Sequence, residues 1–320
     1  MAVPGTLDTV AVIGNGIIGH GVAQVFAVAG KRVRMIGRGA ESLKRAKGRI
    51  GEGLALFRDN GLIGAGEAEA ALVRVETSTD LEDARGAQLV VEAVPEDMAL
   101  KRDIFRRLDA ICPPPAVLAS SSGHPASELV DGVRHPERVI AAHFWYPPQL
   151  LPLVEVCGGP ETSGEVVQWT CTALREAGKE PVVIDREVPG FIGNRIQFAA
   201  LREAWSLWAA GVASAEAIDA VVRNSIGRRL AVTGPIESAD LGGLETMYNF
   251  ARFLQPHLDA SPEPPGVIGD LVRQGRKAIG QGGGIHDWKK RDADALLAAR
   301  RAELIRWLKA DRETKKKEHG

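Results

Sequence analysis

Short apolar runs alternate with longer stretches of helical periodicity through the first half of the chain. Thr9–Ile13 and Arg32–Ile36 have the β-branched, apolar character of buried strands. Between them the pattern predicts a helix over 17–29 that ends at Gly30, and a charged helix over 41–59 follows the second strand. Further strands are expected at 73–77, 88–93, 116–119, 139–143, 153–156 and 182–184. This alternation predicts a doubly wound, mostly parallel α/β sheet.

Beyond Pro189 the spacing of apolar residues becomes helical. The last residues, from Asp311 to Gly320, are expected to form a frayed, solvated end. The pattern therefore predicts two domains, an α/β domain over 1–188 and an all-α domain over 189–320. The helices expected in the second domain are 191–210, which Gly211 ends, 215–226, which Ser214 caps and Gly227 ends, and 293–309.

A glycine-rich turn, Gly14-Asn15-Gly16-Ile17-Ile18-Gly19, joins the first predicted strand to the first predicted helix. The G-x-G-x-x-G spacing is weak evidence alone, but a strand before it and a helix after it are the context in which such a turn binds a dinucleotide. Gly14 permits the tight turn, Gly16 lets the backbone approach a pyrophosphate, and Gly19 lets the helix pack closely on the strand. The helix start, with Ile17 and Ile18, then favours the phosphate charge, which predicts a Rossmann-type cofactor site. The alternative is a glycine-rich turn without a ligand.

The end of the second strand bears on which dinucleotide binds. An NAD site usually presents an acidic residue there, which binds the ribose 2′-hydroxyl. This chain has Gly37-Arg38 instead, which removes repulsion against a 2′-phosphate and offers it a guanidinium. The cofactor is therefore predicted to be NAD or NADP, and these two residues favour NADP. The alternative is that Arg38 is an ordinary solvated loop residue.

Composition and charge narrow the range of partners. The 40 basic and 41 acidic residues give a net charge of -1, which favours neither a nucleic-acid nor a membrane partner. No apolar run is long enough to span a bilayer, and the start of the chain lacks the pattern of a signal peptide. The three cysteines have no metal-ligand spacing, so no metal site is expected. Such sparse cysteines suit a reducing compartment, and we expect a cytoplasmic protein.

Four further positions combine into a candidate catalytic group. His143 ends a predicted strand, and Glu155 stands between valines in another apolar run, where a carboxylate is costly to bury without a partner. A nearby histidine would supply that partner and form a general base held in one tautomer. Ser122 follows a third strand, and Asn194 lies at the start of the first helix of the second domain. Taken singly, each of the four has an ordinary structural explanation.

In order and spacing, these segments resemble the L-3-hydroxyacyl-CoA dehydrogenase family from Val10 to about Trp288. Within the family, the chain is most similar to the branch that contains lambda-crystallin and gulonate dehydrogenase-like enzymes, which act on small hydroxy acids. The matching segments are VAVIGNGIIGHGVAQVFAVAG, LVVEAVPEDMALK, the serine run, HFWYP, PLVEV, VPGFIGNR and GPIE.

The resemblance implies a role for each matching residue. His143 corresponds to the catalytic base, and Glu155 to the carboxylate that orients and stabilises its imidazolium form. Ser122, or Ser121 if the loop is aligned one residue earlier, corresponds to the serine that bonds the substrate oxygen. Asn194 corresponds to the asparagine that holds the reacting carbonyl. The residues that correspond to those lining the cofactor and the active cleft are Glu96 and Lys101.

Three positions depart from the family pattern near the substrate. Tyr146 stands where an asparagine is usual beside the reacting carbon, so it is expected to contact the substrate and to change specificity. Gly53 and Asn60 stand where members that use CoA have a serine and a lysine. Losing the lysine removes a charge that would face a phosphate. These departures favour a small L-3-hydroxy acid as the substrate, with a 3-hydroxyacyl-CoA thioester as the alternative.

Two other functions are weighed against an alcohol dehydrogenase of this family. A non-catalytic, crystallin-like dinucleotide-binding protein is disfavoured because both His143 and Glu155 are present. A lysine-dependent hydroxyacid dehydrogenase is disfavoured because the helix at 191–210 contains no lysine. A homodimer is expected, because the second domain has more large apolar residues than one small core needs, including Trp205, Trp208, Ile218, Val221 and Val222.

Overall fold

The protein is described by a computed structural model that covers residues 3–276, 278–279 and 283–319. The chain divides into two compact units. The first contains residues 1–192 together with 300–320, and the second contains residues 193–299.

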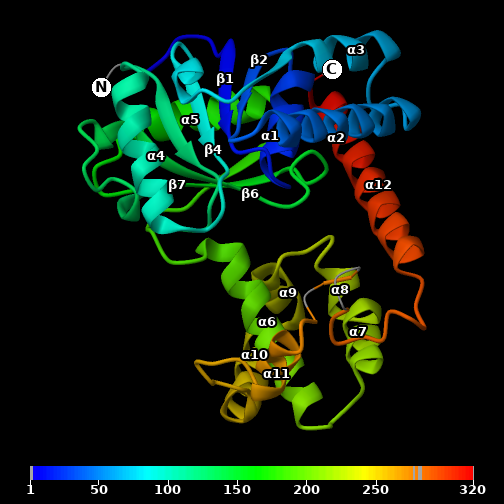
Figure 1. Ribbon diagram of the computed structural model, residues 1–320. Coiled ribbons are helices and arrows are strands. Elements are labelled where there is room, and N and C mark those ends of the chain that lie inside the picture. Colours follow the sequence, from blue (N-terminus) through cyan, green and yellow to red (C-terminus); the bar gives the residue numbers. More distant parts are fainter. Residues whose placement is uncertain (1–2, 277, 280–282, 320) are drawn as a thin grey trace. The chain divides into compact units, whose positions relative to one another are not determined.

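The first unit is built on an eight-stranded sheet with the order β3-β2-β1-β4-β5-β6-β7-β8 (Figure 1). Adjacent strands are parallel except β6 and β7, which pair antiparallel. All the strands expected from the sequence are present, with small shifts at their ends, and the predicted α/β fold is confirmed. The strands are β1 (Thr9–Ile13), β2 (Arg32–Ile36), β3 (Val75–Ser78), β4 (Leu89–Glu92), β5 (Val117–Ser120), β6 (Val139–Phe144), β7 (Leu153–Gly158) and β8 (Glu180–Val183).

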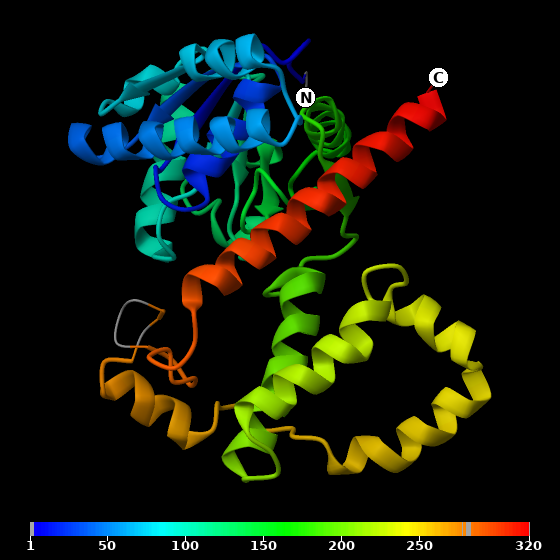
Figure 2. The same ribbon diagram turned by 90° about the vertical axis from the view of Figure 1, so that its right-hand side faces the viewer.

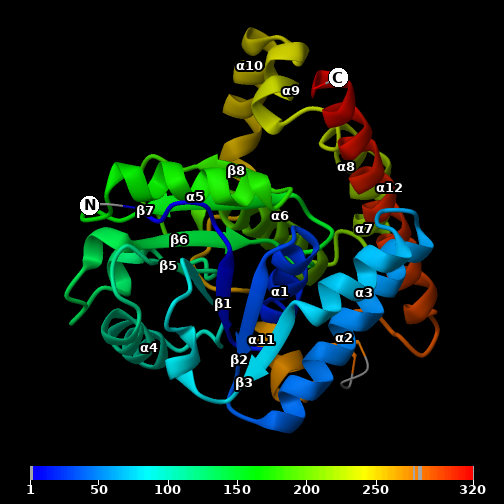
Figure 3. The same ribbon diagram turned by 90° about the horizontal axis from the view of Figure 1, so that it is seen from above.

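Helices cover both faces of this sheet. Alternate residues of a strand point to opposite faces, so Val10 and Val12 of β1 join one core while Ala11 and Ile13 join the other. The first core is closed by α1 (Gly19–Val28), α2 (Ala40–Asp59), α3 (Ala65–Val73) and α5 (Gly164–Glu176), of which α2 and α3 lie side by side in Figure 3. The second core is closed mainly by α4 (Met98–Ile111).

The second unit is helical, as the sequence predicts. The predicted helix end at Gly211 is confirmed by its positive φ of 70°, and Ser214 caps α7 by accepting a hydrogen bond from the Ala217 N–H. The prediction that Gly227 ends this helix was wrong, because α7 ends at Asn224 and Gly227 lies inside the next short helix. The helices are α6 (Phe191–Ala209), α7 (Ala215–Asn224), α8 (Ile226–Arg229), α9 (Pro235–Gly242), α10 (Leu244–Leu254) and α11 (Gly266–Arg273).

The last helix, α12 (Ala293–His319), is longer than the sequence predicts (Figure 2). The expected frayed end beyond Asp311 is helical through His319, and Gly320 lies outside the described residues. The Arg312 guanidinium donates a hydrogen bond of 2.6 Å to the Leu62 carbonyl oxygen, and Ile305 and Leu308 pack against Phe57. These contacts place residues 300–320 with the first unit, whereas the sequence placed them in the second domain.

Within the part of the chain that the structure describes, no helix is both long enough and apolar enough to cross a membrane.

Candidate active site

His143 and Glu155 are brought together by the antiparallel pairing of β6 with β7, in which they lie directly opposite each other. His143 Nδ1 is 2.9 Å from Glu155 Oε2. A carboxylate can only accept a hydrogen bond, so Nδ1 carries the proton and donates it. In the neutral imidazole this leaves Nε2 with a free lone pair, which is the state that a general base needs.

The Glu155 carboxylate is nearly inaccessible, with 2% of the residue exposed. Its other oxygen, Oε1, accepts a hydrogen bond of 3.0 Å from the Ile192 N–H at the start of α6. Its Oε2 also accepts a hydrogen bond of 3.1 Å from the Trp145 indole N–H. Sequence reasoning did not select Trp145; the only signal for it is its position two residues after His143, on the same side of an extended chain.

The serine loop follows β5, the strand next to β6. Ser122 is buried, and its hydroxyl donates to the Glu96 carboxylate, with oxygen-to-oxygen distances of 2.8 and 3.0 Å. The Ser122 oxygen also accepts a hydrogen bond of 3.2 Å from the His124 N–H. Ser121 is buried as well, and its N–H donates to the Glu92 carbonyl. The structure therefore brings Ser122 and Glu96, both selected from the sequence, into direct contact.

Lys101 is fully buried and forms an ion pair that the sequence analysis missed. Its ammonium lies 2.9 Å from Glu92 Oε1 and 3.4 Å from Glu96 Oε2. Glu92 is completely buried, and its Oε2 accepts a hydrogen bond of 2.7 Å from Ser120. Glu92 stands in an apolar run, as Glu155 does, so the criterion that selected Glu155 could have found it. Lys101 thus pairs with both Glu92 and Glu96, the two carboxylates that bond Ser120 and Ser122.

A cavity of about 710 Å³ lies over the carboxyl ends of β1, β2 and β4. Gly14 has a φ of 110°, and a Cβ atom there would collide with the Ala93 carbonyl oxygen. A Cβ atom on Gly19 would collide with the Gly14 carbonyl oxygen, whereas one on Gly16 would meet open space. The glycines thus fit the roles expected for a dinucleotide cradle. The cavity is lined by Gly14, Gly16, Ile17, Ile18, Gly37, Arg38 and Glu96, among others.

A side chain at Gly37 would require neighbouring side chains to shift. A Cβ atom there would lie 2.7 Å from Asn15 Oδ1 and 3.1 Å from Leu43 Cδ2. Asn15 is itself fixed, because its amide donates a hydrogen bond of 3.0 Å to the Ser42 hydroxyl. Gly37 thus presents no carboxylate at this strand end, and Arg38 is exposed on the cavity wall.

A second histidine lies at the phosphate end of this cradle. His20 is buried on the first turn of α1, and its Nδ1 donates a hydrogen bond of 2.7 Å to the Gly16 carbonyl. Burial lowers the pKa of His20, which outweighs the opposing effect of the hydrogen bond with Gly16. This side chain is therefore neutral near pH 7, and the charge that attracts phosphate comes from the helix start.

The three positions that depart from the family pattern, Gly53, Asn60 and Tyr146, lie in different environments. A Cβ atom on Gly53 would collide with the buried Gln24 amide. The Asn60 side-chain amide caps α2 by donating a hydrogen bond of 2.9 Å to the Leu56 carbonyl oxygen. The local structure thus explains why glycine and asparagine occupy these two positions, independently of CoA binding. Tyr146 is 52% exposed and follows β6, and Asn194 belongs to the second unit, on α6.

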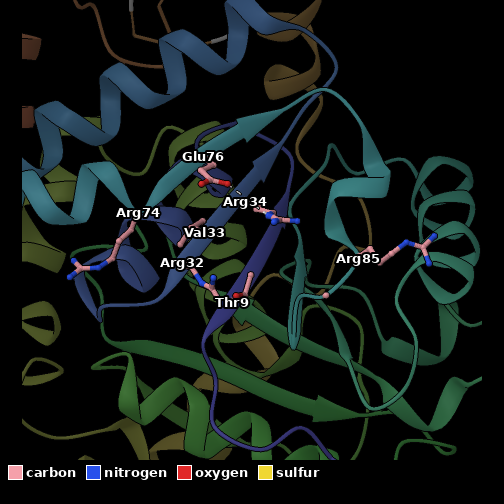
Figure 4. Close-up of a pocket in the computed structure, with 8 residues that line it drawn as sticks. Thr9, Arg32, Val33, Arg34, Arg74, Glu76 and Arg85 are labelled. Carbon is pink, nitrogen blue, oxygen red and sulfur yellow. Dashed lines mark ion pairs between the residues drawn. The ribbon is translucent and has the colours of Figure 1, made fainter.

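Another cavity, of about 180 Å³, opens at the other end of the strands (Figure 4). Thr9 and Arg32 are the first residues of β1 and β2, so this cavity lies at the amino ends of the strands. Figure 4 shows Arg74 and Arg85 pointing away from the cavity centre. Arg34 Nε lies 3.9 Å from Glu76 Oε2, so these two side chains form an ion pair. Ligands bind at the carboxyl ends of the strands in such sheets, which separates this cavity from the candidate active site.

Comparison with known proteins gives matches to two family models. Residues 9–188 match the NAD-binding domain of 3-hydroxyacyl-CoA dehydrogenase, and residues 190–288 match its C-terminal domain.

Individual relatives cover almost the whole chain. L-carnitine dehydrogenase from Streptomyces coelicolor is 35% identical over 97% of this chain and 96% of its own length. A probable 3-hydroxybutyryl-CoA dehydrogenase from Bacillus subtilis is 33% identical over 89% of this chain and 99% of its own. The crystal structure of 5-formyl-3-hydroxy-2-methylpyridine 4-carboxylic acid 5-dehydrogenase, described as an NAD+-dependent dismutase, is 30% identical. It covers 95% of this chain and 99% of its own, with a TM-score of 0.87.

Proposed function

Because the chain belongs to the 3-hydroxyacyl-CoA dehydrogenase family, we propose that it oxidises the hydroxyl group of a small L-3-hydroxy acid, or reduces the matching 3-oxo acid. It is an oxidoreductase that acts on CH–OH groups and has an NAD-binding domain. The observation that carries the proposal is the hydrogen bond between His143 and the buried Glu155, which lie on the same sheet as the glycine-lined cavity.

The proposed mechanism assigns the proton and the hydride to different acceptors. A nicotinamide cofactor, when bound, would supply the acceptor for the hydride of the carbinol carbon. His143 Nε2 takes the hydroxyl proton, and Glu155 stabilises the imidazolium that forms. Ser122 turns its proton from Glu96 toward the substrate oxygen. Gly14 and Gly16, which line the cavity, and the start of α1 would hold the cofactor's pyrophosphate.

We propose a free carboxylate rather than a CoA thioester as the substrate. Relatives named for free acids, carnitine and a pyridine carboxylate, align with nearly all of this chain. Tyr146 replaces the asparagine that is usual beside the reacting carbon, so a bulkier phenol borders the substrate. The relative from Bacillus subtilis named for 3-hydroxybutyryl-CoA keeps the thioester as the second candidate.

The test is a cofactor-reduction screen with both enantiomers of several 3-hydroxy acids and with their CoA thioesters. Each substrate is offered with NAD and with NADP. The proposal predicts reduction of the cofactor by a free L-3-hydroxy acid. Turnover with thioesters alone would establish the second candidate, and binding of cofactor without any turnover would indicate a non-catalytic protein.

NADP is expected to bind at least as tightly as NAD. Gly37 presents no carboxylate, and Arg38 on the cavity wall can pair with a 2′-phosphate. One such charge-assisted contact is worth about 1.5–3 kcal/mol, or roughly tenfold or more in affinity. Arg38→Ala should therefore weaken NADP in fluorescence titrations and leave NAD nearly unchanged. Arg45→Ala, an exposed arginine on α2 outside the cavity wall, is the matched control. A strong preference for NAD that Arg38→Ala does not alter would reject the assignment.

We also propose that the second unit forms a homodimer. No residue of α7, α9, α10 or α11 is fully buried in the single chain. Val221 and Val222, selected from the sequence, are exposed, as are Tyr248, Phe250 and Phe253 of α10. An apolar surface of this extent is typical of an interface with a second copy.

Light scattering at micromolar concentration should give twice the chain mass of 34.2 kDa. Phe253→Asp places a charge on the exposed apolar surface, where the phenylalanine is 65% exposed, and should shift the mass toward that of one chain. Val73→Asp alters a similarly exposed residue of the first unit and should leave the mass unchanged. A single-chain mass for the parent protein would show that the dimer is wrong.

A further inference from the structure

Trp145 contacts both members of the proposed catalytic pair. Its indole N–H donates to Glu155 Oε2 at 3.1 Å, and this is the oxygen that His143 Nδ1 approaches at 2.9 Å. The Trp145 ring centroid lies 5.7 Å from that of the His143 imidazole. The Phe191 ring centroid lies 5.9 Å from the same imidazole. Resting on the proposed function, we propose that Trp145 is a positioning residue, which holds the Glu155 carboxylate and sets how strongly it stabilises the imidazolium.

The sheet explains why this side chain reaches the carboxylate. His143 and Glu155 are directly opposite each other in the β6–β7 ladder. Trp145 follows β6 two residues after His143, so its side chain emerges on the same side as the imidazole, while Phe144 packs into the core on the other side. Diagonal neighbours across a strand pair are within reach of a large aromatic side chain. The indole therefore lies beside Glu155 without leaving the end of the strand.

The shared oxygen gives this contact a chemical consequence. Glu155 Oε2 accepts hydrogen bonds from both the His143 N–H and the Trp145 N–H, so the two donors compete for the same oxygen. Removing the indole N–H leaves the carboxylate free to bond His143 more strongly, which stabilises the protonated imidazole relative to the neutral one. The base would then be neutral only at higher pH, and oxidation would need a higher pH to reach its full rate.

The other groups around His143 and Glu155 contact different atoms from the Trp145 N–H. From β7 the imidazole is faced by the Glu155 carboxylate, and from the start of α6 by the Phe191 ring. The Ile192 N–H bonds the other carboxylate oxygen, Oε1. On β4, two strands from β6, the Glu92 charge is compensated by Lys101. The indole is thus a donor to Oε2 that competes directly with His143.

The test compares Trp145→Phe with the parent protein and with Trp169→Phe. Phenylalanine keeps an aromatic ring but lacks the N–H donor, and the smaller ring is a change that the control variant shares. Trp169 is the matched control, because its indole N–H also makes a hydrogen bond, of 3.1 Å to the Gly5 carbonyl, but lies on α5. Thermal unfolding of all three proteins establishes that they are folded.

Histidine side chains are isotope-labelled and titrated by NMR, with the His143 signal identified from its loss in His143→Gln. The midpoint of the His143 titration should rise by about 0.5–1 pH unit in Trp145→Phe and stay in place in Trp169→Phe. With an active substrate, the low-pH limb of kcat should move upward by the same amount. An unchanged midpoint in a folded Trp145→Phe overturns the proposal. Because the titration needs no turnover, an inactive parent would reject the proposed function and leave this test intact.

Discussion

Replacing His143 with glutamine should lower kcat by at least about 100-fold, the scale on which general acid–base catalysis usually contributes. Glutamine preserves a polar side chain of similar reach but cannot take a proton from the substrate hydroxyl. In the proposed mechanism that proton goes to Nε2, because Nδ1 donates to Glu155 at 2.9 Å. The loss should appear in kcat and kcat/KM alike, because the interaction is made in the transition state.

Cofactor binding should hardly change in His143→Gln, because His143 is absent from the residues that line the dinucleotide cavity. Steady-state kinetics together with a cofactor titration measure the two effects separately. His257→Gln, an exposed histidine of the second unit, is the matched control and should retain normal turnover. Near-normal turnover in His143→Gln would remove the general-base assignment.

Replacing Asp109 with alanine should lower the free energy of unfolding by about 3–5 kcal/mol, because it leaves a buried arginine without its counter-charge. Arg138 is completely buried just before β6, the strand that carries His143. Its guanidinium lies 2.8 Å from the Asp109 carboxylate and also bonds the Asp109 and Ala116 carbonyls. The Asp109 carboxylate accepts further hydrogen bonds from the Arg134 N–H and from His135. This cluster joins α4 to the start of β6.

Urea denaturation at pH 7 measures the loss. Asp59→Ala is the matched control, because its ion pair with Arg58 is exposed and should contribute little. An unfolding midpoint for Asp109→Ala equal to that of the parent would show that the cluster does not stabilise the fold.

The same carboxylate gives the prediction a pH dependence. Burial alone would raise the pKa of Asp109, but the hydrogen bonds from Arg138, from the Arg134 N–H and from His135 hold it below its ordinary value. A group with a lowered pKa in the folded state contributes its stability above its unfolded pKa, about 3.9 for aspartate. That contribution is lost as the pH falls through the lower folded value. The stability difference between the parent and Asp109→Asn should therefore shrink below about pH 4.

The elements that local signals determine were predicted well. β1 and β2 have the bounds expected from their apolar runs, and the glycine turn between β1 and α1 has the steric constraints expected of it. His143 and Glu155 were selected because a carboxylate in an apolar run needs a partner, and the ladder places them opposite each other. For such residues the local sequence already contains the physical cause.

What the sequence did not reveal depends on register and long-range contacts. Trp145 reaches Glu155 only because β6 and β7 pair in one particular register. The end of α12 is ordered by contacts such as that of Arg312 with Leu62, 250 residues earlier, which no local pattern encodes. Gly53 was interpreted as a lost CoA contact, yet its absent side chain makes room for the buried Gln24 amide. That steric cause is visible only in three dimensions.

The choice between a free acid and a thioester is tested most directly by the ratio of two specificity constants. Reduction of acetoacetate and of acetoacetyl-CoA is measured with the same enzyme and the preferred reduced cofactor. An enzyme built for acyl-CoA would use binding energy from the remote nucleotide to raise turnover as well as affinity. Our account predicts a kcat/KM for the thioester that is about equal to, or below, that for the free acid. A ratio above roughly 100 in favour of the thioester would contradict it.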